Sequence, residues 1–135
     1  MTLEEYIRLP HRWQWGHADC TLFAADWVVA ATGKDPGAEL RGTYFDADTA
    51  AAILRVSGGA ERLVGAKLSA LGFHRIQAPC DGDIGMVLAM TGFDAAGARV
   101  QEIPAIRFGP LWAVMSARGV MVKHLDWTGV AWRIA

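Results

Sequence analysis

Cys20 is the residue whose type and position best suit covalent chemistry, because it follows Asp19 where a polar turn becomes a long apolar run, WGHADCTLFAADWVV. Asp19 is a favourable N-cap, so the pattern predicts a helix from Cys20 to about Thr32 that ends at Gly33. A thiol at a helix N-terminus lies beside unpaired backbone N–H groups and the positive end of the helix dipole, and both favour the thiolate. The same N–H groups can stabilise an oxyanion, so this position suits a nucleophile.

Two other interpretations of Cys20 stay open. Free cysteine is among the most frequently buried residue types, so Cys20 can be a plain core residue. It can also be a metal ligand, in a zinc site built from His11, His17, Cys20 and Cys80, but their spacing matches no recognised ligand pattern. We therefore expect no metal, and no motif indicates a cofactor. The charge of Asp19 opposes thiolate formation unless capping satisfies its carboxylate.

A cysteine nucleophile also needs a base, and the chain has four histidines to supply one. His17, three residues before Cys20, is one candidate base, although a role in the loop or the cap explains it more simply. His124 is the other candidate, and a surface or turn position is its plainer interpretation. His11 is expected at the exit of the first helix and His74 on a short exposed strand.

Four residues are candidates for binding: Trp13, Trp15, Asp19 and Asp83. The two tryptophans can line a groove for a glycan or a peptide, although a hydrophobic lid over the 20–32 helix explains them equally well. Asp83 lies in a Gly-Asp turn, which its carboxylate can hold through hydrogen bonds to the backbone. Asp26 lies on an apolar helix face, so its carboxylate needs a partner, and Arg41 is the candidate.

The elements that must position these residues are helices first and strands afterwards. Capping signals and apolar spacing predict helices over about 3–9, 20–32, 47–56 and 60–71, with Asp46 or Asp48 as the cap of the third. The second helix is expected to be largely buried through Leu22, Phe23, Ala25, Trp27, Val28 and Val29. Seven later runs, separated by turn signals, predict strands over 73–76, 83–90, 98–103, 105–108, 111–116, 120–125 and 130–134. This order predicts an α+β fold in which the helix bearing Cys20 packs on an antiparallel sheet, a meander or a partial barrel.

The composition fits one globular domain over residues 1–135, with 53% hydrophobic and 20% charged residues. The net charge is −1 and no basic run is present, so we expect no nucleic-acid partner. No apolar stretch is long enough to cross a membrane, and the acidic N-terminal segment differs from a secretory signal peptide, so we expect neither membrane insertion nor direct export. The two cysteines are expected to be free thiols.

Several stretches together resemble a known superfamily. RWQWGHADCTLFAADWV resembles the nucleophile motif of the NlpC-type cell-wall peptidases, which are papain-like cysteine peptidases. GDIGMV resembles their Gly-Asp strand, with Gly82 and Asp83 on its two fixed positions, and VMVKHLDWTGVAWRI resembles their last two strands. A longer pattern resembles a group of small domains of unknown function encoded among the tail genes of tailed phages, prophages and gene transfer agents. Beyond the cysteine motif, the matching residues are Ala25, Asp26, Trp27, Val28, Thr32, Gly33, Asp35, Pro36, Arg41, Gly42 and Tyr44.

The resemblance implies a papain-like fold over nearly the whole chain, with Cys20 at the nucleophile position. The family's histidine lies on the strand after Gly-Asp, and the matching stretch here, EIPAIRFG, has Ile103 near that position. The third, orienting residue falls near Ser116. A thiol without a base acts only through its thiolate fraction and has no general acid for the leaving amine.

The resemblance therefore implies a tail-associated protein, near the tail tip or hub, with an NlpC-like fold that is catalytically degenerate. Its partners would be other phage tail or tail-tip proteins, and its location the virion tail after synthesis in the bacterial cytoplasm. The alternative is an active cysteine endopeptidase or amidase that cleaves peptidoglycan stem peptides during cell-wall penetration.

Overall fold

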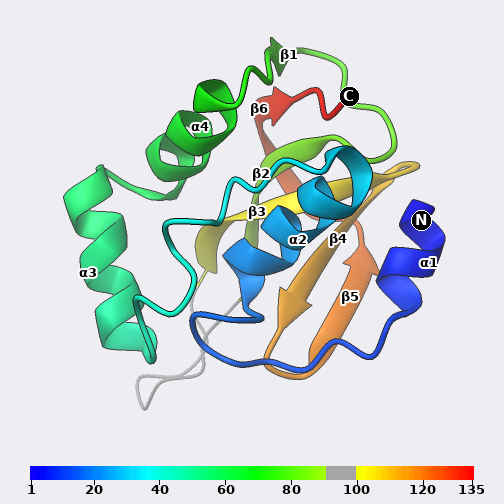
Figure 1. Cartoon of the computed structure of the whole chain (residues 1–135). Coiled ribbons are helices and arrows are strands. Elements are labelled where there is room, and N and C mark those ends of the chain that lie inside the picture. Colours follow the sequence, from blue (N-terminus) through cyan, green and yellow to red (C-terminus); the bar gives the residue numbers. More distant parts are fainter. Residues whose placement is uncertain (91–99) are drawn as a thin grey trace.

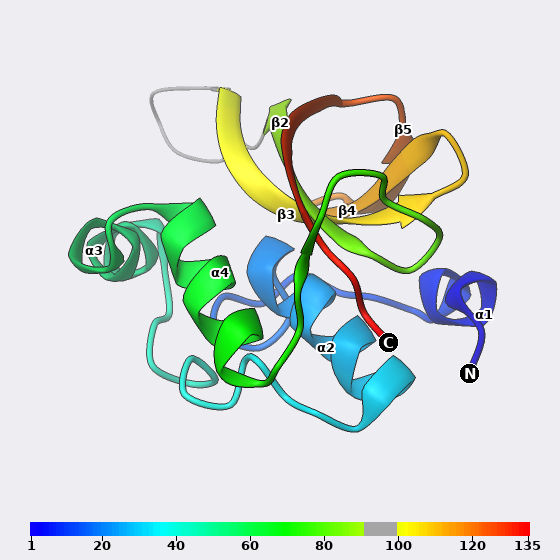
Figure 2. The same cartoon turned by 90° about the horizontal axis from the view of Figure 1, so that it is seen from above.

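The helices precede the sheet along the chain. In the computed structural model, which describes residues 1–90 and 100–135, the helices are α1 (Leu3–Arg8), α2 (Cys20–Thr32), α3 (Ala47–Ser57) and α4 (Ala60–Ala70). The strands are β1 (Arg75–Ile76), β2 (Ile84–Met90), β3 (Val100–Phe108), β4 (Leu111–Ser116), β5 (Gly119–Lys123) and β6 (Asp126–Trp132). Figures 1 and 2 show the sheet as one layer, with α2, α3 and α4 on one side of it. The predicted α+β class is confirmed.

The helices begin where their capping residues predict. Thr2 and Glu5 form the predicted capping box of α1, in which each side chain accepts a hydrogen bond from the other residue's backbone N–H. Asp19 caps α2, and Gly33 ends it in the left-handed conformation with φ 78°. Of the two candidate caps of α3, Asp46 is the one used. Local capping chemistry therefore accounts for these helix boundaries.

The six strands form one antiparallel sheet with the order β1-β6-β2-β3-β4-β5. β2, β3, β4 and β5 follow one another as a meander, whereas β6 returns to pair with β2 and separates it from β1. This return brings the C-terminal segment beside the Gly-Asp turn that precedes β2.

Two strand predictions are wrong. The runs 98–103 and 105–108 were expected as separate strands, but the structure has one strand, β3, that continues through Pro104 (residues 98 and 99 lie outside the described residues). Pro104 pairs in register with Met86 of β2, while β4 pairs only with Ile106–Phe108. Among the described residues, β3 therefore pairs with a strand on one side only at the proline, and proline is tolerated at such edges. The DWTG segment, expected as a turn, is the beginning of β6.

The main core lies between α2 and the sheet. Phe23, Trp27 and Val28 of α2 are buried in one cluster with residues from β2, β3, β4 and β6. Val29 was expected in this buried set, but this prediction is wrong, because Val29 is 37% exposed. α2 is thus fixed on the sheet, and its first residue, Cys20, is fixed with it.

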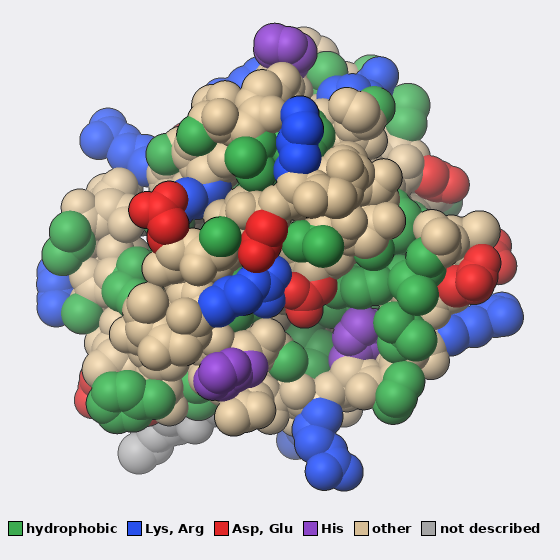
Figure 3. All heavy atoms as spheres, in the orientation of Figure 1, with side chains coloured by type: hydrophobic (Ala, Val, Ile, Leu, Met, Phe, Trp, Pro, Cys, Tyr) green, Lys and Arg blue, Asp and Glu red, His purple; other side chains and the backbone are tan. Residues whose placement is uncertain are grey.

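A second cluster lies on the alternate residues of β2, β3 and β4, which point to the other face of the sheet. Its buried members are Val87, Ala89, Ile103, Ala105, Trp112 and Val114, and Cys20 packs against it at the end of α2. On the face of the molecule in Figure 3, acidic and basic side chains are interspersed. Among the described residues, no helix is long and apolar enough to span a bilayer.

Candidate functional site

Cys20 lies in the wall of a pocket of about 330 Å³ beside the start of α2. The loop before α2 contributes Trp13 and Trp15 to this wall, α3 contributes small and apolar side chains, and β3 contributes Glu102 and Ile103. Ligand pockets in proteins begin at about this size, so the space suits a group of the size of an amino-acid side chain. The fold therefore brings the predicted nucleophile and the predicted groove residues into one pocket.

The carboxylate of Asp19 holds the turn that leads into α2, as its predicted capping role requires. One of its oxygens accepts hydrogen bonds from the N–H groups of Thr21 (3.1 Å) and Leu22 (3.0 Å). The other accepts from the N–H of Gly16 (2.9 Å) and from the hydroxyl of Tyr44 (2.5 Å). Burial and the charge of Asp19 raise the pKa of Tyr44, so its hydroxyl stays protonated as a donor. With 1% of its surface exposed, Asp19 is a buried structural charge with four donors.

The thiol of Cys20 is in the neutral form at physiological pH. Burial, and next to it the negative charge of Asp19, raise the pKa of Cys20 to about 12. The expected net lowering of this pKa by the helix N-terminus is wrong, because desolvation and the charge of Asp19 outweigh the backbone hydrogen bonds at Cys20 and Thr21, which do lower it. The N–H groups of Thr21 and Leu22 already donate to Asp19, so they are not free to bind an oxyanion. Position at a helix terminus is thus outweighed by desolvation and by a neighbouring carboxylate.

Neither candidate base lies in the pocket. His17 is exposed in the turn before α2, where its N–H donates to the carbonyl of Gln14. His124 is exposed between β5 and β6. Neither residue is among those that line the wall around Cys20. Ser116, at the position of the third residue, donates its hydroxyl to the carbonyl of Gly119 in the turn between β4 and β5.

Ile103 occupies the side of the pocket where the resemblance expects a histidine. It lies on β3, lines the pocket with Cys20, and belongs to the core cluster against which Cys20 packs. Its side chain is 4% exposed and carries no group that can transfer a proton. Within the described residues, no histidine lines this pocket.

The two tryptophans both line the pocket and pack on the core. Their rings are T-shaped with centroids 5.1 Å apart. Trp13 packs against the main core cluster, while Trp15 packs against a third cluster around Leu40 and Tyr44. Trp13 and Trp15 therefore line a pocket and also cover the core, so the two alternatives from the sequence, a groove and a lid, do not exclude each other.

Asp83 lies outside the pocket, at the start of β2. Its carboxylate, 2% exposed, accepts hydrogen bonds from the N–H groups of Cys80 and Ile134 and from the guanidinium of Arg133. The indole N–H of Trp27 donates to the carbonyl of the adjacent Gly82 (2.8 Å). The Gly-Asp pair thus joins α2, β2 and the C-terminal segment, as the turn-holding interpretation predicts.

Asp26 has the predicted partner. The guanidinium of Arg41 lies 2.7 Å from its carboxylate and also binds Asp35 through two hydrogen bonds of 3.0 and 3.1 Å. Hydrogen bonding to Arg41 holds the pKa of Asp35 below its ordinary value. Burial raises the pKa of Asp26, although Arg41 opposes this. Three residues of the long sequence pattern are therefore used to fasten the loop after α2 to the helix.

Sequence reasoning missed Glu102 as a site residue. Its carboxylate lines the pocket from β3 and is half-buried, yet the described residues provide it with no hydrogen bond or ion pair. The available signal was its position next to Ile103, on the strand that the resemblance placed beside Cys20.

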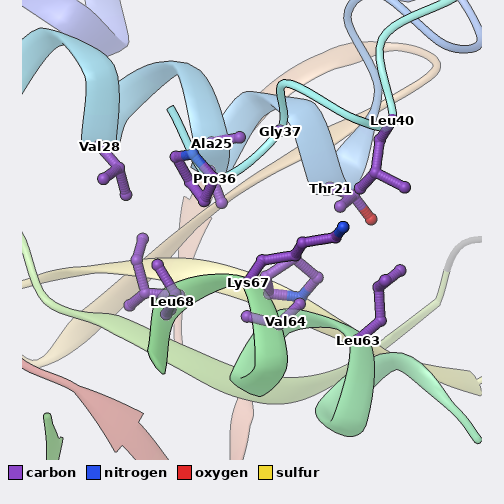
Figure 4. Close-up of a pocket in the computed structure, with 13 residues that line it drawn as sticks. Thr21, Ala25, Val28, Pro36, Gly37, Leu40, Leu63, Val64, Lys67 and Leu68 are labelled. Atoms are coloured by element: carbon purple, nitrogen blue, oxygen red, sulfur yellow. The ribbon is translucent and has the colours of Figure 1, made fainter. Parts of the chain in front are cut away.

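A smaller cavity of about 30 Å³ lies between α2 and α4 (Figure 4). Side chains from the two helices, including Val28 and Leu68, face each other across it, and Lys67 at its edge pairs with Glu39 at 3.2 Å. An apolar cavity of this size holds at most a water molecule or two, so it is a packing void rather than a ligand site.

The histidines and cysteines do not assemble a metal site in the described part of the chain, where no three potential ligands of the His, Cys, Asp and Glu types come together. His11 instead lies against Tyr6 and Phe23 at the end of α1. Cys80 belongs to the Asp83 turn, and both cysteines are free.

Residues 2–134 match the model of a family described as Domain of unknown function (DUF6950). The matched range includes all described strands of the sheet and every residue that lines the pocket around Cys20. Neither a curated protein nor a solved structure matches the chain.

Proposed function

We propose, from the premise that the chain belongs to this family of unknown function, that it is a non-catalytic assembly component of a phage-type tail, with a degenerate NlpC-like peptidase fold. The tail setting and the partners, other tail or tail-tip proteins, are taken from the resemblance of the cysteine motif and the pattern that follows it. The location that goes with this function is the virion tail after synthesis in the bacterial cytoplasm.

The observation that carries the loss of catalysis is the pocket wall around Cys20. Burial and the charge of Asp19 raise the pKa of Cys20 to about 12, so its thiol is held in the unreactive neutral form at pH 7. Acyl transfer also needs a group that takes the thiol proton and returns it to the leaving amine. Ile103 lies where the resemblance expects this group, and no histidine of the described residues lines the pocket, so Cys20 has neither its reactive form nor an imidazole with which to exchange a proton.

The architecture supports the NlpC-like part of the proposal. The cysteine begins a buried central helix, that helix packs on an antiparallel sheet, and the sheet follows the helices in the chain. Several polar residues of the matching pattern hold this scaffold: Asp19 bonds to Gly16 and Tyr44, and Arg41 pairs with two carboxylates. A scaffold kept without its proton carrier fits a protein whose fold serves assembly.

Hydrolysis of purified peptidoglycan sacculi is the direct test. The wild-type protein and a Cys20→Ala variant should both release no soluble muropeptides. Release by the wild type that Cys20→Ala abolishes would establish the alternative function, an active cysteine endopeptidase or amidase.

Thiol reactivity tests the same proposal without a substrate. In a Cys80→Ser background, the rate of iodoacetamide modification of Cys20 should keep rising up to about pH 11, because the pKa of this thiol is about 12. The protein unfolded in urea serves as the control, in which the thiol regains an ordinary pKa. A rate that levels off below pH 8 in the folded protein would contradict the proposal.

Association with particles tests the assembly part. A tagged copy should co-sediment with purified tails or phage-like particles, in amounts that Cys20→Ala leaves unchanged. A chromosomal neighbourhood without tail genes, or a protein absent from purified particles, would refute the tail assignment.

A further inference from the structure

The pocket around Cys20 has acidic and aromatic walls. Its charged side chains are the carboxylates of Asp19 and Glu102, and no lysine or arginine of the described residues lines it. The two carboxylates differ, because Asp19 already accepts four hydrogen bonds. Glu102 is therefore the carboxylate of this pocket that is available to a ligand.

The partial burial of Glu102 has an energetic consequence. A carboxylate that is withdrawn from water without a partner is unfavourable, and a cation that binds it offsets this cost. Asp26, Asp35 and Asp83, which are buried or half-buried near α2, have guanidinium partners within the chain, and Asp19 has four neutral donors. Glu102 lacks such a partner among the described residues, so its carboxylate can accept one from a ligand.

The indole rings of Trp13 and Trp15 favour the same charge. Tryptophan is the side chain that attracts a cation most strongly through its ring face, particularly where water is excluded. A planar guanidinium can stack on an indole and donate two hydrogen bonds to a carboxylate at the same time, which an ammonium group cannot do. Arginine is therefore the cationic side chain that matches this combination of walls.

The surface beside the pocket is apolar. Leu88 pairs in register with Glu102 and Met90 with Val100, so these side chains share one face of the β2–β3 pair. Leu88, Met90 and Val100 are 41%, 55% and 61% exposed. Exposed apolar side chains that adjoin a pocket are typical of protein contact surfaces.

We propose that this pocket binds an arginine side chain of a partner protein, whose guanidinium pairs with Glu102 beside Trp13 and Trp15 while the surrounding chain covers Leu88, Met90 and Val100. This inference rests on the proposed function for the kind of partner, a protein in an assembly. It adds the chemistry by which that partner is recognised.

The test is a titration of the full-length protein with capped single amino acids: N-acetylarginine methylamide and its citrulline and lysine counterparts. Binding is monitored in NMR spectra through the indole N–H signals of Trp13 and Trp15. Trp13→Phe and Trp15→Phe variants assign the two signals. The arginine derivative should shift both signals, and citrulline, which has nearly the same shape without the charge, should bind at least about tenfold more weakly. Glu102→Gln should weaken arginine binding by about tenfold, whereas Glu4→Gln, a matched change on the exposed surface of α1, should leave it unchanged.

Each outcome decides the assignment. Equal binding of arginine and citrulline, no shift of the two indole signals, or unchanged affinity in Glu102→Gln would overturn it. Lysine binding as tight as arginine binding would overturn the choice of guanidinium. The titration is independent of the sacculus assay: cleavage of sacculi removes the proposed function while the pocket can still select arginine, and a failed titration with intact sacculi removes only this inference.

Discussion

The hydrogen bond from Tyr44 to Asp19 should contribute strongly to the stability of the fold, because both groups are buried and one is charged. Tyr44 is 6% and Asp19 1% exposed, so water cannot replace the bond when Tyr44→Phe removes it. A hydrogen bond to a charged group is worth about 1.5–3 kcal/mol. We expect Tyr44→Phe to lower the free energy of unfolding by about 2 kcal/mol on this scale.

Asp19→Asn sharpens this prediction. The new amide oxygen can still accept from Thr21 and Leu22, but the amide NH₂ group replaces the oxygen that accepts from Gly16 and Tyr44. The tyrosine hydroxyl can reverse its role and accept, whereas a backbone N–H cannot. One of the four bonds is therefore lost and the other three lose the carboxylate charge, at a cost of about 3 kcal/mol or more. In the Asp19→Asn background, Tyr44→Phe should cost only about 1 kcal/mol, because it then removes a neutral bond.

Urea unfolding of the wild type, the two single variants and the double variant at pH 7.5, followed by tryptophan fluorescence, measures this cycle. The control is Tyr6→Phe, since the Tyr6 hydroxyl is also buried but donates to a neutral acceptor, the carbonyl of Phe23, at 2.6 Å. Tyr6→Phe should cost about 1 kcal/mol in both backgrounds. Equal costs of Tyr44→Phe in the wild type and in the Asp19→Asn variant, or a cost no larger than that of Tyr6→Phe, would refute the charge-assisted bond.

Two further predictions concern the turn before α2 and the Arg41 ion pairs. Gly16→Ala should lower the free energy of unfolding in urea by about 3 kcal/mol or more, because φ is 76° and the added Cβ would lie 2.1 Å from the carbonyl oxygen of Tyr44. Gly33→Ala is the control: φ is 78° there but the space is open, so the cost should be about 1–2 kcal/mol. Equal costs of the two substitutions would contradict the steric argument. Asp35→Asn should cost about 0.5–1 kcal/mol at pH 7, because Arg41 holds the pKa of Asp35 below its unfolded value. A carboxyl group with a lowered pKa stabilises the fold above its unfolded pKa of about 4, and this stabilisation is lost as the pH falls below that value. The difference in the free energy of unfolding between wild type and Asp35→Asn should therefore be smaller at about pH 3 than at pH 7. A difference that does not change with pH would contradict the prediction.

The sequence by itself determined the starts of α1, α2 and α3, because these depend on neighbouring residues, whereas the extents of β3 and β6 depend on pairing in the sheet. The capping residues of α1, α2 and α3 bond to backbone groups two or three positions away, so their types and spacing suffice to locate the helix starts. The pairing of Asp26 with Arg41 was predictable for a different reason: a carboxylate on an apolar helix face requires a cation, and a nearby loop carries one.

The state of Cys20 was decided only by the tertiary structure. Its position at a helix N-terminus indicates a lowered pKa, but that argument assumes free N–H groups and access to water. In the fold, the half-buried Cys20 packs against the sheet beside the charge of Asp19, and both effects raise its pKa, so the shift has the opposite sign. The charge and the hydrogen bonds that act on Cys20 come from its neighbours Asp19 and Thr21, but the largest cause, desolvation, depends on how the fold packs other residues around the thiol. Tertiary structure also decided the surroundings of Glu102. β3 and α2 lie next to each other in the fold, so Glu102 lines one pocket with Trp13 and Trp15 and has no partner among the described residues.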